Sequence, residues 1–307
     1  KIGKNGTFLF SALSVFGPKE VIKFFEERKV PIKIERGGRV FPVSNKSQDV
    51  LSAMQKYLET NKVEILYDAG VAGFELDKNK IKSVNLQNGS CIIADKCILA
   101  TGGKSYPATG STGDGYQWAK DLGHKIIEIA PALAPVKTKE IWVKDLQGLS
   151  LKNIAINLLQ NNKKKDSRFG EMLFTHFGLS GPVVLDISKK IGELAKNGEV
   201  IISIDLKPAL NYEQLDARLL RDFKEHSNKD LMNYLPELLP QKMIAVILNL
   251  SKINPRKKIN SVTKEERKKI IDLLKNLCLT FNGTTGFDQA IITSGGVDTR
   301  EVDSKTM

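Results

Sequence analysis

The sequence holds few of the residues from which metal centres and disulfide frameworks are built. It has three histidines and three cysteines, the latter at Cys91, Cys97 and Cys278. No HExxH or CxxC spacing is present, so we expect no metal site. Cysteines this few and scattered form no disulfide framework, which predicts a reducing compartment, the cytoplasm.

Long hydrophobic runs are absent as well. No stretch approaches the ~18 uncharged apolar residues that cross a bilayer, and the first residues lead into no signal-peptide core. We therefore expect no membrane association. With 307 residues, 41% of them hydrophobic, the chain can bury a large core in two domains, which excludes intrinsic disorder.

Two phosphate-binding fingerprints are also missing. A P-loop would end in Gly-Lys-Ser/Thr, which the stretch GSTGDGY does not. No GxGxxG follows a strand to open a βαβ unit. Taken literally, the sequence lacks a dinucleotide fingerprint.

Positive charge is what the sequence has in excess. Lys and Arg number 47 against 35 Asp and Glu, a net charge of +12. Residues 137–290 alone carry 26 basic and 18 acidic residues, and residues 252–275 carry nine and three. This charge either contacts the phosphates of a nucleic acid or is an ordinary solvated surface. No aromatic pattern typical of base readout accompanies it.

Hydrophobic spacing predicts short elements in the first part of the chain. We expect helices at 18–29, 47–58 and 114–122, with strands at 38–43, 63–67, 90–93 and 125–129 and a hairpin formed by 71–76 and 80–87. The apolar run 96–100 predicts a strand buried on both faces of a parallel sheet, as does 290–293. Each run leads into paired glycines.

The pattern changes after residue 136. Strands are expected at 149–159 and 199–206, and helices at 212–225, 242–250 and 264–277, which together indicate an α+β module. Because a strand followed by two glycines precedes this module and another follows it, we predict one domain interrupted by a second. The predicted boundaries are 1–136, 137–290 and 291–307.

The segment 100–116, ATGGKSYPATGSTGDGY, is the strongest candidate for a site. It holds five glycines, which let a ligand approach the backbone closely. Hydroxyls of Thr and Ser accompany them, and Asp114 stands where a helix is expected to begin. Ligands of open α/β sheets bind beyond the carboxyl ends of strands. The segment is therefore either a nucleotide or flavin site or a glycine-rich surface loop.

Two other residues could take part in chemistry. His176, in LFTHFGLSGP, has an imidazole suited to proton transfer, or it is a structural histidine before a turn and a helix. Arg39 follows a glycine turn and either binds a carboxylate or phosphate or is an ordinary surface arginine.

Four blocks of sequence, 8–50, 100–116, 173–182 and 292–297, together resemble the BaiN/RdsA family of bacterial NAD(P)/FAD-dependent oxidoreductases, also called aminoacetone-oxidase-type flavoproteins. The resemblance implies an α/β fold with a Rossmann-like FAD domain of the glutathione-reductase type. In this family an insert, part β-barrel and part helical, interrupts that domain. It also implies FAD as cofactor and NAD(P)H as electron donor.

The family's GGGxAG-type turn, TGxGRCN-like stretch and YFAGEVLD-like closing segment do not occur in this sequence. The FAD domain is therefore incomplete here. We expect the chain to be a fragment of a longer protein and inactive by itself.

The resemblance assigns roles to residues in the matched blocks. Ten are implied to contact FAD: Val71, Ala100, Thr101, Gly102, Gly103, Gly113, Asp114, Gly115, Gly295 and Gly296. Arg39 and His176, with Phe41, are implied to lie towards the flavin or substrate as catalytic candidates. Cys91 and Cys97 are expected on structural strands and not at the reaction centre.

Family members have been linked to reduction of a uridine in large-subunit ribosomal RNA to dihydrouridine, to amine oxidation and to steroid reduction. The basic insert favours the ribosomal RNA substrate. One alternative is a flavin-dependent oxidase or reductase of a small molecule such as an amine. Another is that the fragment is a non-catalytic binding module.

Overall fold

A computed structural model describes residues 3–35, 38–78 and 80–306. Gly37 and Asn79, in two of the predicted turns, lie outside the described residues. The chain divides into two compact units. Unit 1 comprises the described residues up to 100 together with 115–127 and those from 297 onward, and unit 2 comprises 101–114 and 128–296.

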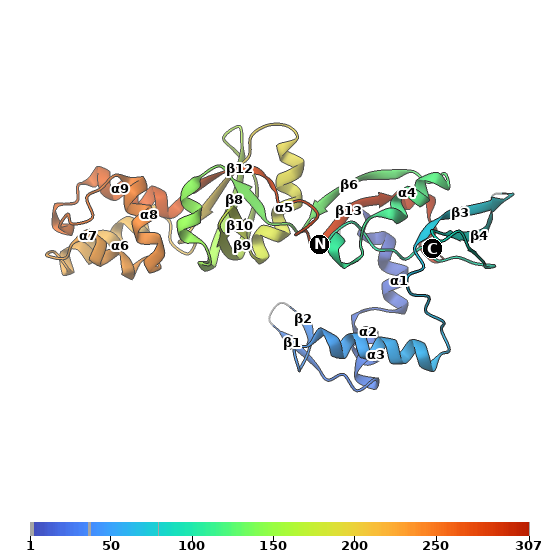
Figure 1. Ribbon diagram of the computed structural model, residues 1–307. Helices are drawn as coiled ribbons and strands as arrows, with labels where there is room; N and C mark the ends of the chain where they lie inside the picture. The colour runs from blue at the N-terminus through green and yellow to red at the C-terminus, as the bar shows by residue number, and fades with distance from the viewer. Residues whose placement is uncertain (1–2, 36–37, 79, 307) are drawn as a thin grey trace. The chain divides into compact units, whose positions relative to one another are not determined.

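Unit 1 contains short helices and two small antiparallel sheets (Figure 1). The helices are α1 (Phe10–Val15), α2 (Pro18–Glu27), α3 (Ser47–Thr60) and α4 (Asp114–Asp121), the last beginning at the boundary residue. Strands β1 (Ile32–Glu35) and β2 (Arg39–Pro42) pair, as do β3 (Val71–Asp77), β4 (Lys80–Leu86) and β5 (Cys91–Ile93). The predicted hairpin and the three predicted helices are confirmed within a few residues. Pro18 stands in the first turn of α2, where its missing N–H costs nothing.

Two predicted strands are wrong. Residues 63–67 and 96–100 belong to no strand, and their side chains are exposed, with Ile98 at 90%. A strand needs a neighbour to accept its backbone hydrogen bonds, and neither segment has one in the part of the chain that the structure describes. Cys97 is consequently exposed and outside any strand, whereas Cys91 lies on β5.

Unit 2 is built around a closed antiparallel barrel (Figure 1). Its strands are β7 (Val136–Thr138), β8 (Ser150–Gln160), β9 (Lys163–Thr175), β10 (Gly178–Ser180), β11 (Ile201–Asp205) and β12 (Leu277–Thr284). Around the barrel their order is β10-β7-β12-β11-β8-β9. Closure leaves no strand edge unpaired, which stabilises a small sheet.

Alternation of side chains along the strands fills the barrel. Ile204 pairs with Ile156 of β8 and with Leu277 of β12, and all three are at most 1% exposed. Helix α5 (Pro182–Ala195) starts after Gly181 and contacts β8, β9, β10 and β12. Its buried residues, which include Ile187 and Ile191, join the same core.

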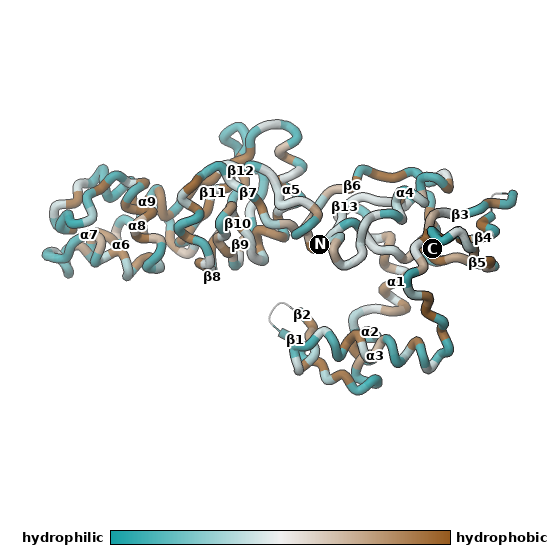
Figure 2. Tube along the Cα trace, in the orientation of Figure 1, coloured by the Kyte–Doolittle hydropathy of each residue, from teal (hydrophilic) through white to brown (hydrophobic). Residues whose placement is uncertain are grey.

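Helices α6 (Tyr212–Glu225), α7 (Leu231–Tyr234), α8 (Gln241–Ser251) and α9 (Lys264–Lys275) form a helical module between β11 and β12. Capping boxes start α6 at Asn211 and α9 at Thr263. In Figure 2, α8 is largely hydrophobic in colour, and it packs between α9 and a 3₁₀ helix, Ile141–Leu146. The predicted order of strands followed by helices is confirmed here.

Strands β6 (Ile126–Ala132) and β13 (Ile292–Val297) form a separate two-stranded sheet. The strand predicted at 290–293 therefore begins two residues later, and the prediction that it is buried is wrong, since Ile291 is 53% and Ile292 48% exposed. The interruption of one domain by another, with boundaries at 137 and 290, stays a prediction.

Membrane-spanning helices and metal-binding clusters are both absent from the described residues. None of the described helices is both long and apolar enough to cross a membrane. Over the same residues, no group of three His, Cys, Asp or Glu side chains lies where it could hold a metal ion.

Two adjacent leucines on α6 test the core of the helical module. Leu219 is fully buried, whereas Leu220 is 40% exposed. We expect Leu219→Ala to lower the free energy of unfolding by about 2–5 kcal/mol, since it leaves a cavity. Leu220→Ala should cost less than about 1 kcal/mol. Urea unfolding measures both, and equal losses would contradict this packing.

Candidate cofactor site

The segment Thr101–Asp114 is a loop that contains one short 3₁₀ helix, Pro107–Thr109, and folds back on itself. Gly102 and Gly113 have φ angles of +74° and +89°, a region that side-chain-bearing residues rarely adopt. A Cβ on Gly113 would also lie 3.3 Å from Cβ of Lys104. Glycine is therefore required here for the loop to close, and the loop exposes bare backbone.

Side-chain hydrogen bonds fix this loop to β13. The Lys104 amide donates to Oγ1 of Thr293 at 2.8 Å, and the hydroxyls of Ser105 and Thr293 lie 3.0 Å apart. The Tyr106 amide donates to the carbonyl of Phe287, and the Lys104 ammonium lies 5.6 Å from the Phe287 ring centroid. Two segments nearly 190 positions apart in sequence are thereby held together.

Gly295 and Gly296 follow Thr293 on β13 and have φ angles of +91° and +108°. We call the loop Thr101–Asp114 and residues 292–296 the glycine cradle. Gly102 and Gly295 are exposed and carry no side chain, whereas Gly296 is buried, and the two segments are held together at Thr293. A ligand that needs close backbone approach, such as the phosphates of a nucleotide, fits such a surface.

Asp114 closes the loop at the start of α4. Its carboxylate accepts a hydrogen bond from the Thr112 hydroxyl at 2.6 Å. The prediction that a helix begins at Asp114 is confirmed. An acid in the first turn suits the positive end of the helix dipole.

The structure distributes the predicted site residues over both units. Thr101, Gly102, Gly103, Gly113, Asp114, Gly295 and Gly296 belong to unit 2 and lie within the cradle segments. Val71, the first residue of β3, belongs to unit 1 with Ala100 and with the buried Gly115 of α4. Their joint contact with a cofactor stays a prediction.

The two catalytic candidates also lie in different units. Arg39 of β2, in unit 1, is exposed, lies 3.6 Å from the Glu35 carboxylate and approaches the Phe41 ring at 5.9 Å. His176, in unit 2, is exposed in the turn between β9 and β10 and packs edge-on against Phe177. Among the described residues its ring makes no hydrogen bond, so the imidazole is accessible to solvent and solute.

Sequence reasoning missed Thr293 and Lys104. Thr293 was placed in a buried strand, and Lys104 was counted only as part of a glycine-rich motif. The available signal was the polar pair Thr293-Ser294 at the end of the apolar run before Gly295 and Gly296, because a hydroxyl there can accept a hydrogen bond from another loop.

Part of the basic run 252–275 is neutralised internally. Lys257 pairs with Glu266 at 2.7 Å, Lys258 with Asp230 at 2.8 Å and Lys275 with Asp205 at 2.7 Å. Arg267 pairs with Asp216 of α6 at 2.5 Å. Lys252, Arg256 and Lys268 are exposed and form no ion pair within the described residues. Only part of the run is therefore available to attract an anion, and contact with phosphates stays a prediction.

Characterised proteins resemble the chain over nearly its whole length. A 3-dehydro-bile acid delta(4,6)-reductase of Clostridium scindens is 29% identical, with 99% of this chain and 74% of that protein covered. Ribosomal RNA dihydrouridine synthases of Haemophilus influenzae and Escherichia coli are 28% and 27% identical, with 100% of this chain and 74% and 73% of theirs covered. These relatives place the chain in the class of oxidoreductase enzymes, as predicted.

A sequence profile described as the HI0933-like protein barrel and H2TH domain matches residues 130–292. This span contains the barrel, α5 and the helical module. The chain belongs to the HI0933-like family, and the family predicted from the four sequence blocks is confirmed.

The link at Thr293 is open to a direct test. Thr293→Val removes the hydroxyl that accepts from the Lys104 amide, and we expect that amide to exchange with deuterium at least about ten times faster. Thr293→Ser keeps the hydroxyl and should retain the protection. Hydrogen exchange measured by NMR distinguishes them, and unchanged exchange in Thr293→Val would show that the loop is held by other contacts.

Proposed function

We propose that this chain forms part of a flavin-dependent oxidoreductase that binds FAD at the glycine cradle. The observation that carries the proposal is the hydrogen bond from the Lys104 amide to Thr293, which holds two glycine-rich segments together. Backbone N–H groups of such segments bind the phosphates of a nucleotide cofactor. Val71, Ala100 and Gly115 of unit 1 are proposed as further contacts.

The same proposal includes the domain organisation. Residues 1–136 and 291–307 would contribute to a Rossmann-like FAD domain, and residues 137–290 would be its insert. The exposed apolar segments 63–67 and 96–100 support this assignment, because a parallel sheet buries such runs on both faces.

Flavin bound here would supply hydride chemistry, with NAD(P)H as the proposed electron donor. The chain's own residues would orient the substrate and supply a proton. His176 has an accessible ring whose nitrogen can hold that proton. Arg39 offers an exposed guanidinium to an anionic group of the substrate.

For the substrate we propose a uridine of large-subunit ribosomal RNA. Its C5=C6 bond would accept the hydride on one carbon and the proton on the other, which gives dihydrouridine. Two relatives are named for this reaction. Exposed lysines Lys163, Lys164 and Lys165 at the β8–β9 turn add basic surface that suits RNA.

The second candidate is reduction of a small molecule. Its support is the relative named for a bile acid reduction, which matches at 29% identity. In that case the basic surface would be incidental to catalysis.

Flavin binding at the cradle is tested with Gly113→Val. The new side chain would need a φ angle it rarely adopts and would meet Lys104, so we expect at least about tenfold weaker FAD binding. Gly192→Ala on α5, where a Cβ meets open space, is the control and should bind FAD as the unaltered protein does. Titration by flavin fluorescence measures both, and equal affinities would place FAD elsewhere.

The choice of substrate is tested by turnover. We expect NAD(P)H oxidation by the full-length, flavin-loaded protein to require a large-subunit ribosomal RNA transcript and to yield dihydrouridine, which mass spectrometry detects. Matched reactions contain an amine or a 3-oxo steroid instead of RNA. Turnover with one of these and none with RNA would favour the small-molecule candidate.

A further inference from the structure

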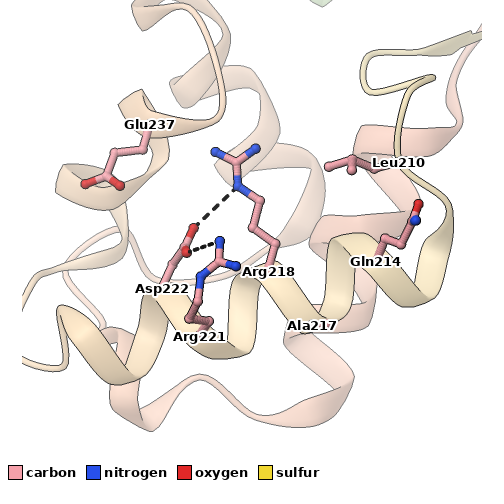
Figure 3. A pocket seen from close by; sticks show the side chains of 7 residues that line it. All are labelled: Leu210, Gln214, Ala217, Arg218, Arg221, Asp222 and Glu237. Atoms are coloured by element: carbon pink, nitrogen blue, oxygen red, sulfur yellow. Dashed lines mark hydrogen bonds and ion pairs between the residues drawn. The ribbon is translucent and has the colours of Figure 1, made fainter.

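A pocket open to solvent lies on α6 of the helical module, on elements that the proposed cofactor site does not use. It is lined by Leu210, Gln214, Ala217, Arg218, Arg221, Asp222 and Glu237 (Figure 3). Arg218 and Arg221 stand one helical turn apart on α6, so their side chains emerge on the same face. Figure 3 shows both guanidinium groups beside Asp222.

A buried carboxylate orients the two arginines. Asp222 is 8% exposed and accepts a hydrogen bond at 2.8 Å from the hydroxyl of Tyr234, which is fully buried. Nε of Arg218 lies 3.6 Å and Nη2 of Arg221 3.3 Å from the Asp222 oxygens. Charge-assisted contacts of this kind restrict a guanidinium without covering all of its five N–H donors.

The side chains that line the pocket balance in charge, with Arg218 and Arg221 against Asp222 and Glu237. Beside it, Lys229 pairs with Glu237 at 2.9 Å, which adds a third positive charge to these four, while the printed ion pairs of the two arginines are with Asp222. The half-buried Lys207 ammonium has no acidic or hydrogen-bonding partner among the described side chains. Burial and the nearby Arg218 guanidinium lower the pKa of Lys207. These cations repel one another, and a bound anion would relieve that repulsion.

The chemistry of the pocket favours a phosphate group carried by a polyanion. Guanidinium N–H pairs match phosphate oxygens in geometry, and Arg221 is 65% exposed. Residues 212–275 as a whole carry 14 basic and nine acidic residues, so the surrounding surface also attracts an extended anion. The Gln214 amide at the edge of the pocket adds a neutral donor and acceptor.

We propose that the pocket on α6 binds a phosphodiester group of an RNA strand. Arg218 and Arg221 are the phosphate ligands, and Asp222 with Tyr234 positions them. The inference rests on the proposed ribosomal RNA function and adds to it a defined RNA contact in the helical module.

The first experiment compares two double variants that remove equal charge from this module. Arg218→Gln with Arg221→Gln should weaken binding of a ribosomal RNA transcript at least about tenfold and reduce the slope of log K against log salt by about 1 to 2. Arg256→Gln with Lys268→Gln, which changes exposed unpaired cations, should have a smaller effect. Equal losses of RNA affinity in the two double variants would overturn the proposal, because RNA would then be held only by the general positive charge of the module.

A second pair of variants leaves the arginines in place, because their removal strips Asp222 of its ion pairs and can lower stability. Ala217 is exposed and lines the pocket. Ala217→Glu puts a carboxylate four residues before Arg221, where it competes with phosphate. Ala217→Gln is the uncharged control. We expect RNA binding to weaken several-fold in the Glu variant alone, with an unchanged melting temperature. Unchanged binding in Ala217→Glu would overturn the proposal.

The failure of this inference can be told apart from failure of the proposed function. If the unaltered protein binds no RNA at low salt, the ribosomal RNA function fails, and the inference with it. If the protein binds and reduces RNA and the pocket variants do so equally well, only the inference fails. AMP serves as the probe for a free nucleotide. AMP binding that is lost in the arginine double, while RNA binding stays unchanged, would overturn the assignment to RNA.

Discussion

Closure of the barrel by β7 and β12 is the constraint on which unit 2 depends. Thr138 pairs with Phe281 and Val136 with Thr284, so strands nearly 150 residues apart complete the ring. The helical module leaves the barrel after β11 and returns at β12, and pairing of those two strands fixes both ends of the module. Along the chain, β6 precedes the first strand of the barrel and its partner β13 follows the last.

The two proposed sites use different kinds of donor for phosphate groups. The glycine cradle is proposed to bind phosphate through backbone N–H groups beside its glycines, and its two segments are held by the hydroxyl of Thr293. The pocket on α6 offers guanidinium groups that a buried aspartate orients. Backbone donors suit a cofactor held closely in one pose, whereas arginines on a helix suit an extended, exchangeable polyanion.

Local patterns predicted the elements whose stability is local or whose partner is adjacent in sequence. The helix at 212–225 matches α6 in both bounds, because capping at Asn211 and an apolar stripe through Leu215 and Leu219 act within a few residues. The hairpin β3–β4 was predicted for the same reason. The prediction of a strand at 96–100 was wrong. Apolar composition indicates which residues can be buried, but it does not show whether a neighbouring strand is there to pair with them.

The sequence by itself determined the family, the basic character of residues 137–290, the glycine-rich segments and most helices, since each follows from composition or from order along the chain. Only the tertiary structure decided that Lys104 meets Thr293, that Arg267 and Lys275 are paired, and that Arg218 and Arg221 share a pocket with Asp222. These contacts join residues on different elements or depend on which helix face is covered. Such geometry arises from packing of the whole unit, so the spacing of residues along the sequence does not predict it.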